Sequence, residues 1–261
     1  LAADPTIAAW AIRALADHEA QVSTVPIEPL LAGLRSDDAR TRREALFALT
    51  RVGDARHATA MSALLGDADP VVAHTAVQAL VRLRAADPAF AVIDDASVTA
   101  ARRLGALQVI QALHDERVVD QVINRLNRET DAGRRQDLVR VLARLHHIEG
   151  PWTGDSWGTR PDTRGPYYQP ERWAASDRIN DVLKDLMDKA SGDEAVALNE
   201  LFALYRVTPG DPVGRLMQLA QSDDSILPTL ALQLSTAPTI PPEAIPLLQR
   251  ALTWTPPPPP P

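Results

Sequence analysis

An all-α fold of stacked helix pairs is predicted by three features of this sequence. Of its 261 residues, 45% are hydrophobic but only 4% are aromatic, so alanine, leucine and valine supply the apolar mass, which suits closely packed helices. An acidic residue followed by small or apolar residues recurs with a period near 31 residues. One irregular segment, Trp152 to Trp173, interrupts this helical pattern. Together they predict an α-solenoid of about six or seven helix pairs with one ordered irregular insert.

Each copy of the repeat begins with an aspartate, followed seven and eleven positions later by small or apolar residues. An aspartate caps the free N–H groups at a helix start, and Pro5 and Pro70 occupy the tolerated first helical position. We therefore expect a long helix after each aspartate, in which the alanine lets neighbouring helices approach closely and the leucine packs in the seam between them. The copies are Asp4 with Ala11 and Leu15, Asp38 with Ala45 and Leu49, Asp69 with Ala76 and Leu80, Asp131 with Leu138 and Leu142, and two looser copies, Asp193 with Leu201 and Leu204 and Asp224 with Ala231 and Leu234.

Shorter apolar segments lie between these helices, so each period is predicted to be a helix pair. They are residues 29–34, 58–65, 118–126, 215–220 and 245–252. A single pair cannot bury its apolar face alone, whereas stacked neighbours form one continuous core. Residues 1–255 are therefore expected to form a single repeat domain. Residues 256–261 are all proline and are expected to form an extended polyproline linker or tail.

The repeat resembles HEAT repeats, which share their architecture with armadillo repeats. The runs that carry this resemblance are DPTIAAWAIRAL, DDARTRREALFAL and DADPVVAHTAVQAL. Arg40, Arg42 and Arg43 fall in the first turns of a second helix, where HEAT helices often carry a basic residue. The resemblance implies a scaffold for protein–protein interaction rather than an enzyme.

The insert, residues 150–174, is expected to be ordered because it holds five of the eleven aromatic residues of the chain, and disordered segments are poor in aromatics. The helix before it is predicted over residues 134–147, with Gly150 as a left-handed cap and Pro151 ending the helix. His146 and His147 would then lie in its last turn, where histidines can bond free carbonyls and meet the negative end of the helix dipole.

Three interpretations of the insert remain open. It can be a structural plug, in which its tryptophans are buried; a dock for a partner, because tryptophan, tyrosine and arginine dominate interface hot spots; or a carbohydrate-binding or carbohydrate-processing site, because aromatic faces stack on sugars while arginine and aspartate hold hydroxyls. Its candidate binding residues are Trp152, Trp157, Arg160, Asp162, Arg164, Tyr167, Tyr168 and Trp173. No catalytic residue, metal ligand or cofactor is predicted, because the carboxylates are few and no nucleotide-binding or nucleophile motif is present.

The segment GDSWGTRPDTRGPYYQP has a second resemblance. It is similar to a signature in the HEAT region of large bacterial extracytoplasmic proteins that often combine a dehydrogenase-like β-propeller, HEAT repeats and a c-type haem domain. This resemblance implies a periplasmic or otherwise extracytoplasmic chain. Its partners would be neighbouring domains of a larger protein, a propeller or a haem domain among them.

The overall composition excludes several function classes. A formal net charge of -7 argues against a general nucleic-acid binder, which needs a basic face. The chain has no cysteine, so disulfides, thiol catalysis and cysteine-ligated zinc are excluded within it. No run of about 18 apolar residues occurs, so no membrane span is predicted.

Overall fold

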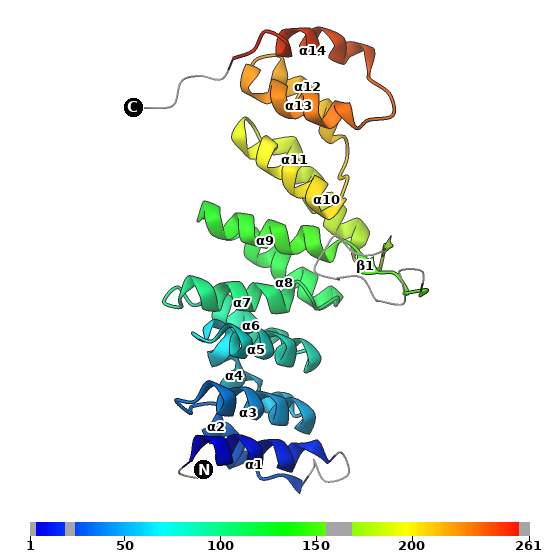
Figure 1. Ribbon diagram of the computed structural model, residues 1–261. Coiled ribbons are helices and arrows are strands. Elements are labelled where there is room, and N and C mark those ends of the chain that lie inside the picture. The colour runs from blue at the N-terminus through cyan, green and yellow to red at the C-terminus, as the bar shows by residue number, and fades with distance from the viewer. Residues whose placement is uncertain (1–3, 19–23, 155–168, 256–261) are drawn as a thin grey trace. The chain divides into compact units, whose positions relative to one another are not determined.

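The computed structural model describes residues 4–18, 24–154 and 169–255. Within these residues it has fourteen α-helices, several short 3-10 helices and one two-stranded sheet (Figure 1). The prediction of an all-α, HEAT/armadillo-like solenoid of about six or seven helix pairs is confirmed. Contacts divide the chain into two compact units, residues 1–118 (unit 1) and 119–261 (unit 2), with the division inside helix α8 (Glu116–Leu126). The single repeat domain over residues 1–255 stays a prediction.

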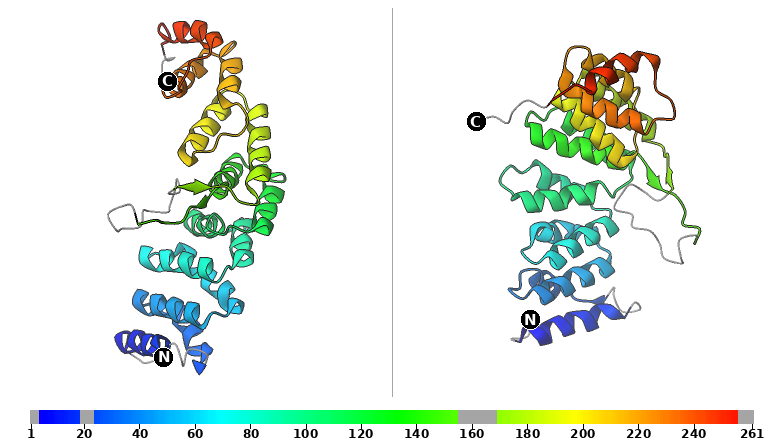
Figure 2. Two further views of the ribbon diagram at one scale, coloured as in Figure 1. Left: turned by 90° about the vertical axis from the view of Figure 1, so that its right-hand side faces the viewer. Right: turned by 45° about the horizontal axis from the view of Figure 1, so that its top comes forward.

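Unit 1 consists of two layers of helices. In the first layer α1, α3, α5 and α7 pack against one another in succession, and the second layer holds α2, α4, η3 and α6 (Figure 2). The elements are α1 (Pro5–Asp17), α2 (Ile27–Gly33), α3 (Ala39–Val52), η2 (Ala55–His57), α4 (Ala58–Met61), η3 (Ser62–Gly66), α5 (Pro70–Arg82), α6 (Ala86–Asp94) and α7 (Ala100–Ile110).

The capping aspartates set where the long helices of unit 1 begin. Asp4, Asp38 and Asp69 each accept hydrogen bonds from N–H groups in the first turn of α1, α3 and α5, as the repeat predicts. Thr99 caps α7 in the same way, through a bond of 3.3 Å from the Arg102 amide. This repeat is hidden in the sequence because a threonine stands where the other copies have aspartate.

Burial at the repeat positions differs between α3 and α1. Ala45 and Leu49 of α3 are fully buried, as expected. Ala11 and Leu15 of α1 are exposed, and the prediction that they pack in the core is wrong. Within the described residues α1 packs against one helix of its layer, α3, so a different set of its side chains is buried, namely Ala8, Ala9, Ile12 and Ala16.

Unit 2 continues the pattern of helices and contains the sheet. Its strands pair antiparallel, Ile148 with Glu171 and Glu149 with Pro170, and they join the two ends of the insert. The elements after α8 are α9 (Ala132–Leu145), β1 (Ile148–Glu149), β2 (Pro170–Glu171), α10 (Ser176–Lys189), α11 (Asp193–Tyr205), α12 (Pro212–Ala220), η4 (Asp224–Ile226), α13 (Leu227–Ser235), η5 (Pro242–Ala244) and α14 (Ile245–Ala251).

The two looser repeat copies begin differently from the prediction. Asp131 caps α9 as expected. Gly192, however, is the N-cap of α11, and Asp193 lies in its first turn. Asp224 lies inside η4, which Asp223 caps through the Ser225 amide. A carboxylate within the first turn still meets the positive end of the helix dipole, so the position favours the helix without capping it.

The shorter predicted helices are found with one exception. Residues 29–34, 118–126, 215–220 and 245–252 correspond to α2, α8, α12 and α14, with Leu34 and Leu252 one residue beyond the ends of α2 and α14. The segment 58–65 is instead split into the α-helix α4 and the 3-10 helix η3. Among the described residues, no helix is both long and apolar enough to cross a membrane.

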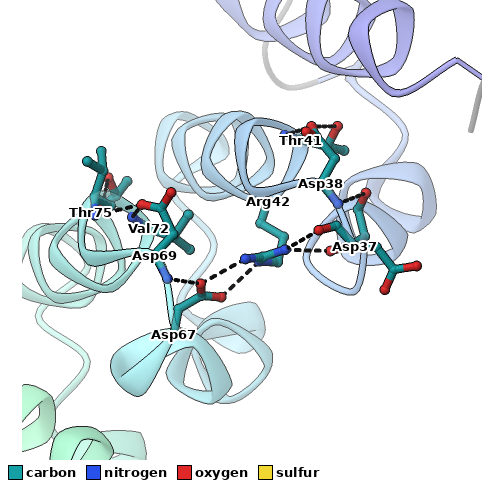
Figure 3. Close-up of polar contacts among 10 residues, drawn as sticks. Asp37, Asp38, Thr41, Arg42, Asp67, Asp69, Val72 and Thr75 are labelled. Atoms are coloured by element: carbon teal, nitrogen blue, oxygen red, sulfur yellow. Dashed lines mark hydrogen bonds and ion pairs between the residues drawn. The ribbon is translucent and has the colours of Figure 1, made fainter.

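Arg42 connects three segments of unit 1 (Figure 3). Its Nε and Nη2 donate to the two carboxylate oxygens of Asp67, each at 2.8 Å, and its Nη1 donates to the carbonyls of Ser36 and Asp37, each at 2.9 Å. Burial alone would raise the pKa of Asp67, but the bonds from Arg42 and from the Asp69 amide outweigh it and hold that pKa below its usual value. The loops before α3 and before α5 are thus held together by one guanidinium.

The same arrangement recurs at the fourth residue after the cap of two further helices. Arg103 of α7 donates to the carbonyls of Ile93 and Asp95. Arg135 of α9 donates to the carbonyls of Leu126 and Glu129. In both cases the arginine binds one carbonyl at the end of the preceding helix and one in the loop that precedes its own helix, which fixes how that helix follows the one before.

Candidate protein-interaction site

Most of the predicted insert site lies outside the described residues. These are Trp157, Arg160, Asp162, Arg164, Tyr167 and Tyr168. Their proposed roles as a dock or a carbohydrate site stay predictions, as does the expectation that the insert is ordered. Only Trp152 and Trp173, at its two ends, have a described position.

Trp173 attaches the C-terminal end of the insert, which we call its root, to the end of α9. Its indole Nε1 donates to the Leu145 carbonyl at 2.7 Å, and its side chain is half-buried. Its backbone N–H donates to the Ser176 hydroxyl, which in turn donates to the His146 carbonyl at 2.6 Å. Trp152, in contrast, is 40% exposed. The interpretation of the insert as a plug that buries Trp152 is therefore wrong for this residue.

Gly150 has a different role from the predicted helix cap. Helix α9 ends at Leu145, and Gly150 is not among the residues with positive φ. Its N–H donates to the Gln169 carbonyl at 3.1 Å, next to the β1–β2 pair. A β-carbon on Gly150 would lie 2.3 Å from that carbonyl oxygen, so only glycine permits this approach. The glycine serves the closure of the insert rather than the termination of the helix.

The two histidines at the end of α9 form a neutral pair. The Nδ1 of His146 lies 3.2 Å from the ring nitrogens of His147, and the His146 side chain is buried. Burial, together with the nearby His147 and Arg172, lowers the pKa of His146 to about 4. The pKa of His147 is lowered as well, by burial and by Arg172. Both rings are therefore uncharged at neutral pH and do not meet the helix dipole with a positive charge, contrary to the prediction.

A groove crosses the first layer of unit 1, over α1, α3 and α5. Two overlapping cavities of about 710 and 370 Å³ form it, within the size range of ligand sites in proteins. We call it the α1–α3–α5 groove. The residues that line both cavities are Ala16, Asp17, Phe47, Arg51 and Thr75; Arg13, Arg43, Glu44, Val71, Gln78 and Arg82 line one of them.

Exposed apolar side chains are distributed unequally between the two layers of unit 1. Among its described residues, the large exposed ones all belong to α1, α3, α5 and α7, and they are Ile7, Trp10, Leu15, Phe47, Val71 and Leu104. Phe47, 51% exposed, lines both cavities of the groove. A large exposed apolar side chain within a cavity marks an interaction site more often than scattered exposure does.

Arginines surround Phe47 in this groove. Arg51 donates to the Ala16 carbonyl at 2.8 Å and to Asp17 at 3.1 Å. Arg43 donates to Glu44 at 2.8 Å, and Glu44 is only 4% exposed. Each carboxylate of the groove is therefore already paired with an arginine.

Two further arginines carry no carboxylate partner within the described part of the chain. Arg82 is exposed at the α5 side of the groove. Arg40 lies over the ring of Trp10, with its guanidinium carbon 4.4 Å from the ring centroid. Arg13, which lines the groove, lies 5.9 Å from the same centroid. Two cations thus lie near the exposed indole.

The model of HEAT repeats matches residues 2–80 and 27–97 of this chain. These matches cover α1 to α6 and therefore the whole α1–α3–α5 groove. The fold is a HEAT/armadillo-like α-solenoid.

Solved structures of repeat proteins are similar to the chain at low sequence identity. A designed armadillo repeat protein, in complex with the peptide (KR)4, is 13% identical, with 77% of this chain and 92% of that chain covered and a TM-score of 0.34. Two engineered proteins are each 15% identical. One has a TM-score of 0.36 over 96% of this chain and 75% of that chain, and the other has 0.27 over 97% and 91%. No curated protein matches the chain.

The repeat pattern did not identify the groove, although the HEAT repeats contain a signal for it. The pattern marks positions seven and eleven after the cap, which are buried in α3 and α5. Phe47 lies nine positions after Asp38, on a different face of α3. A large apolar residue off the buried face, with Arg43 and Arg51 four residues to either side, is the feature that could have indicated a binding surface.

Proposed function

We propose that the chain is a non-catalytic scaffold whose α1–α3–α5 groove receives part of a partner protein. HEAT-type solenoids are generally protein-interaction scaffolds. The observation that carries the proposal is Phe47, a half-exposed aromatic residue in a groove of about 710 Å³, surrounded by arginines. Aromatic anchors and arginine dominate the energetics of protein interfaces.

The chemistry of the groove favours binding over catalysis. Its carboxylates, Asp17 and Glu44, both form ion pairs with arginines. General acid–base or nucleophilic catalysis requires a nucleophile and a base within hydrogen-bond reach. Among the residues that line the groove, the hydroxyls of Thr50 and Thr75 donate to the Leu46 and Val71 carbonyls of their own helices, which leaves them unsuited as nucleophiles.

The partner that we propose is a neighbouring domain of a larger, extracytoplasmic protein. The resemblance of the insert to the HEAT region of propeller- and haem-containing proteins supports this proposal. A further support is the base of the insert, where the β1–β2 pair joins its two ends and the Trp173 indole bonds to the Leu145 carbonyl of α9. An insert attached in this way can present its aromatic residues to a second partner surface.

Substitution of Phe47 tests the proposed function. The Phe47→Ser variant should lose proteins that the full wild-type chain captures from extracts of the source cells, because the anchor is removed. Its thermal unfolding midpoint should stay close to that of the wild type, since exposed substitutions change stability by only about 0.5 kcal/mol. Captured proteins are quantified by mass spectrometry.

The matched control is Leu252→Ser, which removes another exposed apolar residue, in unit 2. It should capture the same proteins as the wild type. If Phe47→Ser captures them equally well while folding normally, the groove is not the binding site and the proposal fails.

A further inference from the structure

We infer that the occupant of the α1–α3–α5 groove is an extended acidic segment with one large apolar side chain. This inference rests on the proposed function and specifies its partner. It follows from three properties of the groove: the excess of arginines over carboxylates, the position of these arginines on both sides of Phe47, and the course of the groove across three helices.

The groove is positive although the chain as a whole is negative. Four arginines line it, Arg13, Arg43, Arg51 and Arg82, and only two carboxylates, Asp17 and Glu44. The formal charge of the whole chain is -7. A positive groove on a negative protein directs an acidic segment to the groove, because the negative surface elsewhere repels that segment.

The available cations lie on both sides of Phe47. Arg82 of α5, on one side, has no carboxylate partner within the described residues. At the α1 side, three arginines, Arg13, Arg43 and Arg51, share two carboxylates, Asp17 and Glu44. A segment with carboxylates on both sides of an apolar residue would meet arginines on both sides while that residue contacts Phe47.

The course of the groove favours an extended segment. Packed helices lie roughly 8–10 Å apart, so a path across α1, α3 and α5 covers about 20 Å. An extended chain advances about 3.3 Å per residue. About six residues therefore span the groove, which leaves room for one central apolar residue and acidic residues before and after it.

A nucleic acid fits the groove less well, although its phosphates are also negative. Phosphate binding draws its affinity from several free cations along the strand. Here Asp17 and Glu44 lie within the path, and Arg43 and Arg51 are already engaged with them. A protein segment can avoid these carboxylates by the order of its side chains, whereas a uniform phosphate backbone cannot.

Selection from a random library of displayed eight-residue peptides tests the inference on the full chain. We expect peptides enriched on the wild type to carry net negative charge and one large apolar residue. Arg82→Glu should weaken the binding of the enriched peptides by about fivefold or more. The substitution removes a partly exposed ion pair with the peptide and replaces it by repulsion between two carboxylates. The binding should also weaken as sodium chloride is raised.

The control for charge is Arg35→Glu. Arg35 is exposed, has no side-chain partner within the described residues and does not line the groove. It should leave peptide binding within about twofold of the wild type. Equal losses in Arg35→Glu and Arg82→Glu would show a general charge effect and overturn the inference.

The Phe47→Ser variant separates the inference from the proposed function. Enriched peptides that need Phe47 but are neutral or basic would overturn the acidic partner and leave the scaffold role intact. A library with no Phe47-dependent enrichment would remove both. A twelve-nucleotide single strand that binds more tightly than the enriched peptides, and needs Arg82, would replace the acidic segment by a nucleic acid.

Discussion

Arg42 stabilises unit 1 more than its position near the surface of a helix would indicate. Its guanidinium donates to Asp67 through two nitrogens and to two main-chain carbonyls through a third. The side chains of Arg42 and Asp67 are 15% and 7% exposed. Removal of one partner from such a pair leaves a buried charge without compensation, which is the costly case for an ion pair.

We predict that Arg42→Ala lowers the free energy of unfolding by about 2–3 kcal/mol, from the loss of the buried pair and its hydrogen bonds. Urea denaturation followed by circular dichroism measures this change. The control is Arg56→Ala, which removes an exposed ion pair with Asp54 in the same unit, and it should change stability little. Equal effects of the two substitutions would mean that the Arg42 contacts do not stabilise the fold.

His146 makes the stability of unit 2 dependent on pH. The folded-state pKa of His146, about 4, is below its ordinary value of 6.5. Between these values the unfolded chain binds a proton that the folded chain excludes, so stability is full above about pH 6.5 and falls as the pH is lowered toward 4. The difference corresponds to about 3 kcal/mol at pH 4.

The variant His146→Phe should show a smaller decrease in unfolding temperature between pH 6.5 and 4 than the wild type. Phenylalanine fills a similar volume and does not titrate in this range. Differential scanning calorimetry at a series of pH values compares the two proteins, and carboxylates common to both cancel in the difference. Parallel pH curves would show that His146 is protonated equally in both states.

At the scale of elements, the sequence predicts helix starts better than helix ends or partners. The four strict aspartates mark the starts of α1, α3, α5 and α9 because capping is a local interaction of one side chain with nearby N–H groups. Helix α7 escaped the pattern because Thr99 is its cap. The role of Gly150 could not be predicted from local sequence, because it depends on Gln169, nineteen residues away.

Glycines allow η3 and α7 to approach closely. A β-carbon on Gly105 would lie 2.5 Å from the Leu65 carbonyl oxygen, and one on Gly66 would lie 2.7 Å from the Arg102 nitrogen. We predict that Gly105→Ala destabilises the protein by about 2 kcal/mol, because backbone must move to admit the methyl group. Thermal unfolding provides the measurement.

Gly133→Ala is the matched control for a glycine within a helix. Its added β-carbon would meet only the Asp131 carboxylate, at 3.4 Å. Alanine favours a helix over glycine by up to about 1 kcal/mol, so this variant should be neutral or more stable. If Gly105→Ala were stabilising as well, the close contact between η3 and α7 would not be present in solution.

At the scale of the whole molecule, the fold class followed from the sequence and the binding surface did not. A repeated pattern identifies the face of each helix that is buried, because every neighbour imposes the same requirement. Which remaining side chains share a surface depends on the helices that lie side by side. Arg13, Phe47 and Arg82 belong to three helices and meet in one groove only after α1, α3 and α5 have packed.

The insert is the opposite case. Its composition distinguished it from the rest of the sequence. In the structure, Trp173 at its C-terminal end is attached to α9 by a hydrogen bond. Its remaining candidate residues lie outside the described part of the chain, so their proposed roles rest on residue type and on family resemblance. A local concentration of aromatics can thus indicate where function resides without specifying the chemistry.

The contacts of Arg42, Arg103 and Arg135 have a consequence for how such a chain can diversify. Each binds at least one carbonyl oxygen of the preceding loop, and every amino acid supplies a carbonyl oxygen. The side chains of those loops are therefore free to change without loss of the bond that orients the next helix. Mutations could accumulate at these loops, and new surface chemistry could arise there, while the order of the stack is inherited unchanged.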